Sequence, residues 1–91
     1  MHVLMIGHLT GKDHSELLQE EGMFIAKARA EGIVRDVFLK ADRSGPVLIL
    51  ADTTADEARE RMAGLPFIVH DIASFDYIEI TLPPAGLPGS K

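Results

Sequence analysis

The order of strand-like and helix-like segments is the feature that most constrains the fold of this chain. Four segments have the composition of β-strands: residues 2–9, 33–40, 47–52 and 73–82. Two segments have the periodicity of amphipathic helices: residues 14–31 and 53–64. The connector ADRSGP between the second and third strands has the Asp, Ser, Gly and Pro residues of a hairpin loop. The predicted order is therefore β-α-β-β-α-β.

Two β-α-β halves joined by a hairpin match the ferredoxin-like arrangement. The expected fold class is α+β, with a four-stranded antiparallel sheet and both helices on one face. The continuous apolar run of residues 47–52 predicts a central strand. The other face of the sheet is left uncovered, and the strand residues expected to supply apolar surface there are Val34, Phe38, Phe75 and Tyr77. An uncovered apolar face predicts a partner, and two such sheets packed face to face would make a dimeric α/β barrel.

The chain is expected to form one domain over residues 1–82, because 91 residues are about the minimum for an independent core. The tail, residues 83–91, contains three of the five prolines and is predicted to be extended or disordered. With so small a core, a homodimer or higher homo-oligomer is a reasonable expectation.

Composition limits the classes of partner and compartment. The net charge is −5, and the nine Lys and Arg residues are scattered, which disfavours nucleic acid as a partner. The absence of cysteine excludes disulfides and thiolate chemistry. The apolar runs are too short to span a bilayer, and the first residues lack the basic region of a signal peptide. We therefore expect a cytoplasmic protein that does not enter membranes.

Turn and capping residues predict where the helices begin and end. Asp13 or Ser15 is expected to cap the first helix, and Gly32 is expected to end it. Thr53 or Thr54 is expected to begin the second helix.

Glu21 is the most unusual residue of the first predicted helix. With 100° between successive residues, it falls near the centre of the apolar sector. The apolar residues of this sector are Leu17, Leu18, Phe24, Ile25 and Ala28. A carboxylate that faces a core is costly unless it is paired, protonated or at a cleft. Glu21 is therefore either part of a functional site or one partner of a structural pair.

Three motifs in order carry a family resemblance. AEG is followed by IVRDVFL, TTADEARERMAG is followed by the leucine-proline-aromatic turn LPF, and the last strand pattern ends in YIEITLPP. Over roughly residues 1–84, this order resembles the muconolactone isomerase family and the YCII-related proteins of the dimeric α/β-barrel superfamily. The stretch FIVHDIASF differs from the proline-rich, aromatic stretch of the isomerases, which argues against a lactone as the substrate.

The resemblance aligns Glu21 with an acid of the isomerases and Arg35 with an arginine of their second strand. A 1,3-proton shift needs a base beside an acidified carbon and a donor or cation for the enolate oxygen. Glu21 is the candidate base, and Arg35 is the candidate partner for a substrate carboxylate or enolate. The structural alternatives are a buried Glu21–Arg35 ion pair, or a carboxylate bonded to a neighbouring chain.

The remaining candidates are the histidines and the single tyrosine. His14 lies on the same predicted face as Glu21 and is either a second acid or base or a residue of a frayed helix start. His70, beside an acid in a loop, is a possible catalytic residue. His8, at a strand end, and Tyr77 are candidates for substrate binding, and packing in the core of an interface is the alternative for Tyr77.

No spacing typical of a metal site, phosphate loop or nucleophile elbow occurs, so no metal and no cofactor are expected. The leading expectation is an isomerase or lyase that transfers protons on a small carboxylated or lactone-like metabolite. The alternative is a non-catalytic module that binds a metabolite or acts through its oligomer surface.

Overall fold

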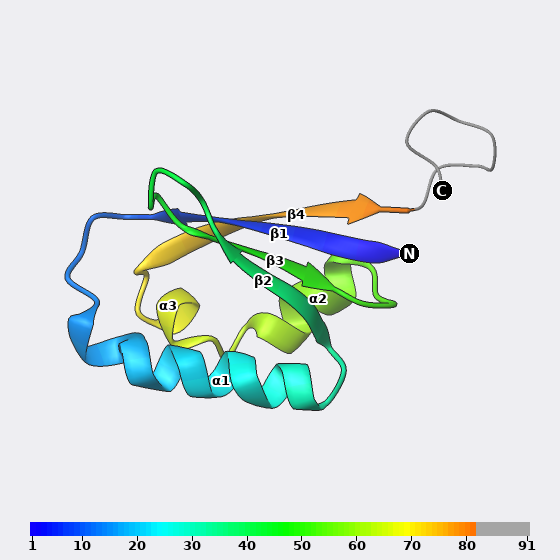
Figure 1. Ribbon diagram of the computed structural model, residues 1–91, viewed down its shortest axis with the longest axis horizontal. Coiled ribbons are helices and arrows are strands. Elements are labelled where there is room, and N and C mark those ends of the chain that lie inside the picture. Colours follow the sequence, from blue (N-terminus) through cyan, green and yellow to red (C-terminus); the bar gives the residue numbers. More distant parts are fainter. Residues whose placement is uncertain (82–91) are drawn as a thin grey trace.

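The computed structural model describes residues 1–81 and contains the predicted order of elements (Figure 1). The strands are β1 (His2–Leu9), β2 (Val34–Leu39), β3 (Pro46–Leu50) and β4 (Ala73–Ile80). The helices are α1 (Leu18–Ala30), α2 (Ala55–Met62) and the short α3 (Pro66–Val69), and a 3-10 turn, η1 (Ser15–Leu17), precedes α1. The predicted extended tail at residues 83–91 lies outside the described residues.

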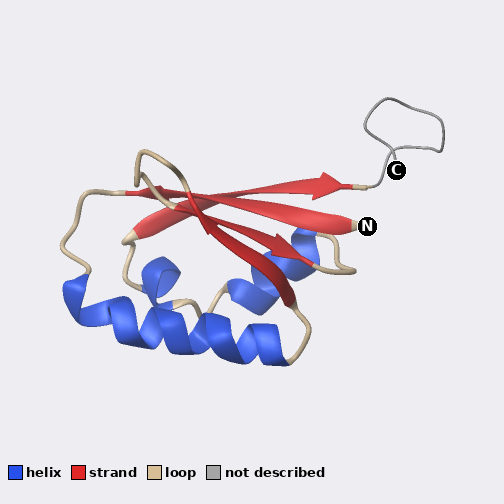
Figure 2. Ribbon diagram, viewed as in Figure 1, coloured by secondary structure: helices blue, strands red, loops and turns tan. Residues whose placement is uncertain are grey.

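The four strands form one antiparallel sheet in the order β2-β3-β1-β4. All the helices of the described part lie on one face of this sheet (Figure 2). The molecule is thus a small α+β domain whose strand order is compatible with a ferredoxin-like fold. β3 lies between β2 and β1, which confirms the prediction that it is an interior strand. Within residues 1–81, no helix has both the length and the apolar character needed to cross a membrane.

The ends of α1 follow local chemistry. Gly32 has a φ of 78°, and its N–H donates to the carbonyl of Arg29 at 3.0 Å. The next N–H, of Ile33, donates to Ala28 at 2.9 Å, which completes a Schellman motif and confirms the predicted helix end. At the other end, Asp13 Oδ1 accepts from the backbone N–H of Ser15 at 3.0 Å. The first turn there is 3-10 rather than α, so the α-helix begins four residues later than predicted. The predicted cap at Asp13 or Ser15 is wrong, because the N-cap residue of α1 is Leu17 and no side chain caps it.

Thr54, rather than Thr53, caps α2. Its hydroxyl accepts from the backbone N–H of Glu57 at 3.3 Å, and the Glu57 carboxylate accepts from the backbone N–H of Thr54 at 3.3 Å. This reciprocal pair is a capping box, and it satisfies two helix-terminal donors.

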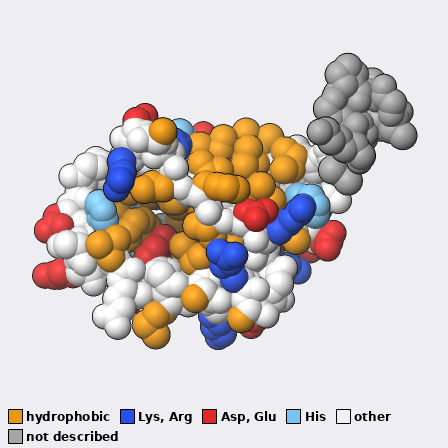
Figure 3. All heavy atoms as spheres, viewed as in Figure 1, with side chains coloured by type: hydrophobic (Ala, Val, Ile, Leu, Met, Phe, Trp, Pro, Cys, Tyr) orange, Lys and Arg blue, Asp and Glu red, His pale blue; other side chains and the backbone are white. Residues whose placement is uncertain are grey.

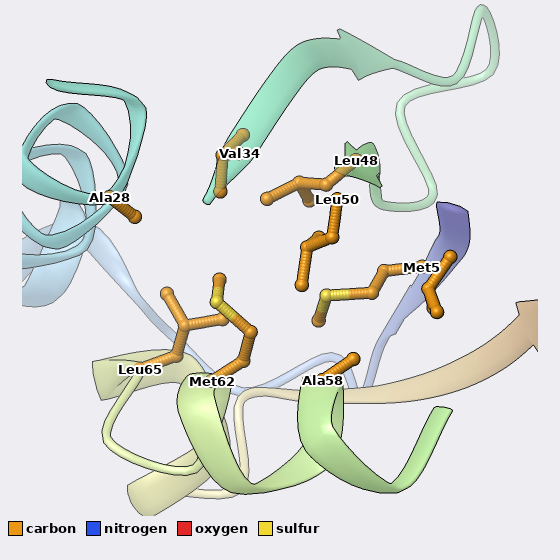
Figure 4. Close-up of a cluster of buried hydrophobic side chains, with 9 residues drawn as sticks. Met5, Ala28, Val34, Leu48, Leu50, Ala58, Met62 and Leu65 are labelled. Atoms are coloured by element: carbon orange, nitrogen blue, oxygen red, sulfur yellow. The ribbon is translucent and has the colours of Figure 1, made fainter. Parts of the chain in front are cut away.

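The core lies between the inner face of the sheet and the helices (Figure 4). Its fully buried side chains come from alternate positions of β1 and β3, from the facing side of α2 and from the residue just before α3: Val3, Met5, Leu48, Leu50, Ala58, Met62 and Leu65. No helix was predicted for residues 66–69, which form the short helix α3 beginning at Pro66. A single helical turn is too short to show a hydrophobic period, and this is why the sequence pattern missed it. α3 buries Phe67 in a second apolar cluster.

The prediction for the uncovered face of the sheet is wrong for three of its four residues. Val34, Phe75 and Tyr77 belong to or pack against the core under the helices, and only Phe38 is exposed, at 55%. Strand parity decides this, because Tyr77 lies opposite the buried Met5 and directly opposed residues share a face. We call the apolar surface that the strands do present on the uncovered side the outer apolar face: Leu4, Ile6, Phe38, Val47, Ile49, Ile78 and Ile80.

Candidate functional site

A cavity of about 580 Å³ lies between the N-terminal half of α1 and the β2–β3 hairpin. Figure 3 shows a hollow on this side of the molecule, with mostly apolar walls and an acidic side chain within it. The apolar lining residues are Leu9, Leu18, Ile25, Leu39, Pro46 and Phe67, and the others are His14, Glu21, Gly22 and Arg43. A concave, mostly apolar site of this size with a few polar groups is typical of small-molecule pockets.

Glu21 lies on the buried side of α1, as its position in the helical period predicts, and is only 6% exposed. Its Oε1 atom accepts a hydrogen bond from the backbone N–H of Phe67 at 3.0 Å. Its Oε2 atom is buried and has no hydrogen-bond partner among residues 1–81. One oxygen of the carboxyl group therefore accepts from the first turn of α3, and the other is a buried acceptor whose hydrogen-bonding capacity is unsatisfied.

Burial raises the pKa of the Glu21 carboxyl group above its usual value of 4.5, and the hydrogen bond from Phe67 opposes only part of this effect. Desolvation disfavours the charged form of any carboxyl group. The consequence is a group that both holds a proton at higher pH than an exposed glutamate and accepts one more readily once ionised. These are the properties of a general acid or base.

His14 lines the same cavity and packs edge-on against Phe67, with 5.3 Å between the ring centroids and 67° between the planes. Its Nδ1 atom lies 3.4 Å from the carbonyl oxygen of Lys12, which only accepts hydrogen bonds. In the tautomer that makes this contact, Nδ1 carries the proton and Nε2 carries the lone pair. The structure therefore brings His14 and Glu21 together at one cavity.

Arg43 is the lining residue that the sequence did not indicate. It belongs to the hairpin loop between β2 and β3, where its neighbours gave only a turn signal. Nothing in the local sequence distinguishes it from an ordinary solvated arginine. Arg43 and Glu21 line the same cavity because the β2–β3 hairpin extends along α1 as far as the first turns of that helix.

Arg35 does not lie at the cavity, and no ion pair joins it to Glu21. It is exposed beside a β-bulge at the start of β2, and its Nε atom lies 3.6 Å from Asp36 Oδ2. β2 runs back along α1 from the turn that connects them (Figure 1). Glu21 is about 15 Å along the helix from Glu31, and about five strand residues are needed to cover that distance. β2 therefore comes alongside Glu21 only near Leu39 and the hairpin, well beyond Arg35.

His8, His70 and Tyr77 also lie away from the cavity lining. His8 is exposed at the end of β1, with Nε2 2.9 Å from Asp76 Oδ2 and Nδ1 3.2 Å from Lys40 Nζ. His70 is the exposed C-cap residue of α3.

Tyr77 is half-buried on the helix side of the sheet, where the guanidinium of Arg59 lies 5.0 Å from the centre of its ring. Burial raises the pKa of its phenol, and the nearby Arg59 charge partly offsets this. Tyr77 therefore packs against the core on the helix side of the sheet, and not at an interface on the uncovered face.

Across residues 1–81, no three side chains of His, Cys, Asp or Glu are grouped so that they could hold a metal ion. The chemistry that the cavity offers is therefore that of a buried carboxyl group, an imidazole and a guanidinium within apolar walls. Comparisons of the chain with protein-family models and with curated proteins find no match.

Proposed function

We propose that the protein is a cofactor-independent isomerase or lyase of the muconolactone isomerase type, which transfers a proton on a small carboxylated or lactone-like metabolite. The observation that carries this proposal is the buried, unpartnered Oε2 atom of Glu21 at the wall of a mostly apolar cavity. A buried acceptor without a partner costs free energy, and a bound substrate would recover it.

In the proposed reaction, ionised Glu21 removes a proton from a carbon next to a carbonyl group. The electron pair of the C–H bond forms a carbon–carbon double bond, and the π pair of the carbonyl group moves to its oxygen. The product is an enolate, or an enol once that oxygen is protonated. Protonated Glu21 then returns the proton to a different carbon of the conjugated system, which completes an isomerisation with no net change in protons. His14 is the neighbouring group that exchanges a proton with the enol oxygen. The apolar walls keep water away from the reactive intermediate.

Deuterium wash-in tests this proposal on whole classes of compound, so the substrate need not be identified first. The protein is incubated in D₂O with a panel of unsaturated lactones, enones and 2-keto acids, and C–H signals are followed by NMR. We expect enzyme-dependent exchange of an α-proton in at least one class, and a large loss of exchange in Glu21→Gln. Glu20→Gln is the matched control, because Glu20 is the exposed neighbour on the same helix. Exchange that survives in Glu21→Gln at the wild-type rate would show that Glu21 is not the base.

A second candidate function is that of a non-catalytic metabolite-binding or oligomeric interaction module. The outer apolar face favours it, because monomeric proteins rarely leave a continuous apolar sheet surface exposed. We propose that two copies of the chain pack these faces together as a homodimer of ferredoxin-like subunits, in the manner of a dimeric α/β barrel. The cavity lies on the helix side of the sheet, so the homodimer is compatible with either function.

A further inference from the structure

The β2–β3 turn holds Arg43 in a defined conformation. Arg43 has a φ of 64°, in the left-handed region, and its N–H donates to the carbonyl of Lys40 at 2.9 Å. The side chain of Asp42 accepts from the backbone N–H of Ser44 at 2.9 Å and so braces the same turn. Glycine or asparagine would occupy this conformation at lower cost, so the backbone gives no reason for an arginine.

The guanidinium of Arg43 has no carboxylate partner in the described part of the chain. No carboxylate of residues 1–81 lies within 4.0 Å of the Arg43 guanidinium, although five other ion pairs of that length form among these residues. Among residues 1–81, Glu21 is the only acid in the cavity lining, and its hydrogen-bond partner is the backbone N–H of Phe67 rather than Arg43. An arginine without a carboxylate partner at an apolar cavity favours an anionic ligand.

The apolar side chains of the cavity indicate what kind of molecule would carry the anionic group. Leu18 and Leu39 are each 55% exposed at the cavity, on the helix and the hairpin, respectively. A ligand with an apolar body would cover both side chains. Among residues 1–81, Arg43 is the only Lys or Arg of the lining. One cation suits a single carboxylate better than a phosphate, because phosphate sites gather several donors.

We propose that the cavity binds an amphipathic monocarboxylate, with its carboxylate on the guanidinium of Arg43 and its apolar body against Leu18, Leu39 and Phe67. This inference rests on the proposed function, because it concerns the same cavity. It adds Arg43 as the substrate-binding cation, a role that the family resemblance gave to Arg35. It also narrows the ligand to compounds that carry one negative charge and a hydrocarbon body.

Paired probes that differ only in charge test this inference. The ¹⁵N-labelled full chain is titrated with octanoate and 4-phenylbutyrate, and with the neutral amides of both, while backbone amide shifts are followed. We expect both carboxylates to shift the amides of Gly22, Leu39 and Phe67, and to bind about tenfold or more tightly than their amides. Arg43→Gln should remove this preference, and Arg43→Lys should retain part of it.

Arg29→Gln is the matched control, because Arg29 is exposed on α1 and does not line the cavity. It should keep the full preference for the carboxylates. The inference is overturned if Arg43→Gln keeps that preference, or if neither carboxylate shifts the cavity amides. Carboxylate binding that depends on Arg43, without deuterium exchange on any compound of the panel, would support the ligand class and refute the proposed catalysis.

Discussion

The carboxyl group of Glu21 in α1 accepts a hydrogen bond from the backbone N–H of Phe67 in α3, 46 residues further along the chain. This bond joins the long helix to the short one that follows α2. The second oxygen of the same group is buried without a partner among the described residues. Glu21 is therefore a structural acceptor through Oε1, with a backbone partner that the sequence did not indicate, and its role as an acid or base through Oε2 stays a proposal.

The raised pKa of Glu21 predicts a pH-dependent stability. Below pH 4.5 the group is protonated in both the folded and the unfolded states. Between 4.5 and the higher pKa of the folded state, only the unfolded state releases the proton, so the free energy of unfolding falls as the pH rises. Above that pKa the contribution is constant.

Glu21→Gln removes this titration. We expect its free energy of unfolding, relative to the wild type, to increase with pH through that interval. Urea unfolding at a series of pH values from about 4 to about 9 measures the difference. The free energy of unfolding of Glu20→Gln should vary with pH in the same way as that of the wild type. The same pH dependence in Glu21→Gln would contradict a raised pKa caused by burial.

Two glycines of the α1 region should respond to alanine in opposite directions. Gly22 lies within α1, and a Cβ atom built there meets nothing within 4 Å, so Gly22→Ala should stabilise the protein by about 1 kcal/mol. Gly32 has a φ of 78°, so Gly32→Ala should destabilise it by about 1 kcal/mol. Thermal and urea unfolding of the two variants give the comparison. Equal effects of the two substitutions on stability would contradict the left-handed backbone conformation of Gly32 at the end of α1.

Truncation of a buried methionine and of an exposed methionine should have very different effects on the free energy of unfolding. Met62 of α2 is fully buried between the helices and the sheet, so Met62→Ala should lower the free energy of unfolding by about 2–5 kcal/mol. Met23 of α1 is 65% exposed, and Met23→Ala should stay within about 0.5 kcal/mol of the wild type. Chemical denaturation provides both values, and a small loss for Met62→Ala would place the core elsewhere.

The proposed homodimer makes a prediction about the outer apolar face. Ile78 of β4 is 46% exposed and lies opposite Leu4 on that face. A charge introduced there would be desolvated on association, so Ile78→Asp should convert dimer into folded monomer. Val69→Asp is the control, because Val69 is 62% exposed on α3, on the helix side of the sheet. Sedimentation velocity at micromolar concentrations measures the effect, and a monomeric wild type would refute the dimer.

The sequence located the elements of secondary structure because they depend on local chemistry. Apolar alternation marked the strands, and helix ends followed residues such as Gly32 and Thr54, whose hydrogen bonds reach only a few positions along the chain. The burial of Glu21 was also predictable, since a helical period fixes which residues share a face.

The partners of Glu21 were decided only by the tertiary structure. Arg35 was assigned to it by resemblance, yet β2 begins beside the C-terminal end of α1, so Arg35 lies away from the cavity at the N-terminal half of that helix. Arg43 and Phe67 reach that cavity because a hairpin and a short helix converge on the first turns of α1. The same holds for Phe75 and Tyr77, whose side of the sheet depends on their register with β1. Local periodicity determines which face of its own helix or strand a side chain occupies. Contacts between distant segments depend instead on the register of the strands and on the lengths of the helices and strands that bring those segments together, and no single segment encodes these.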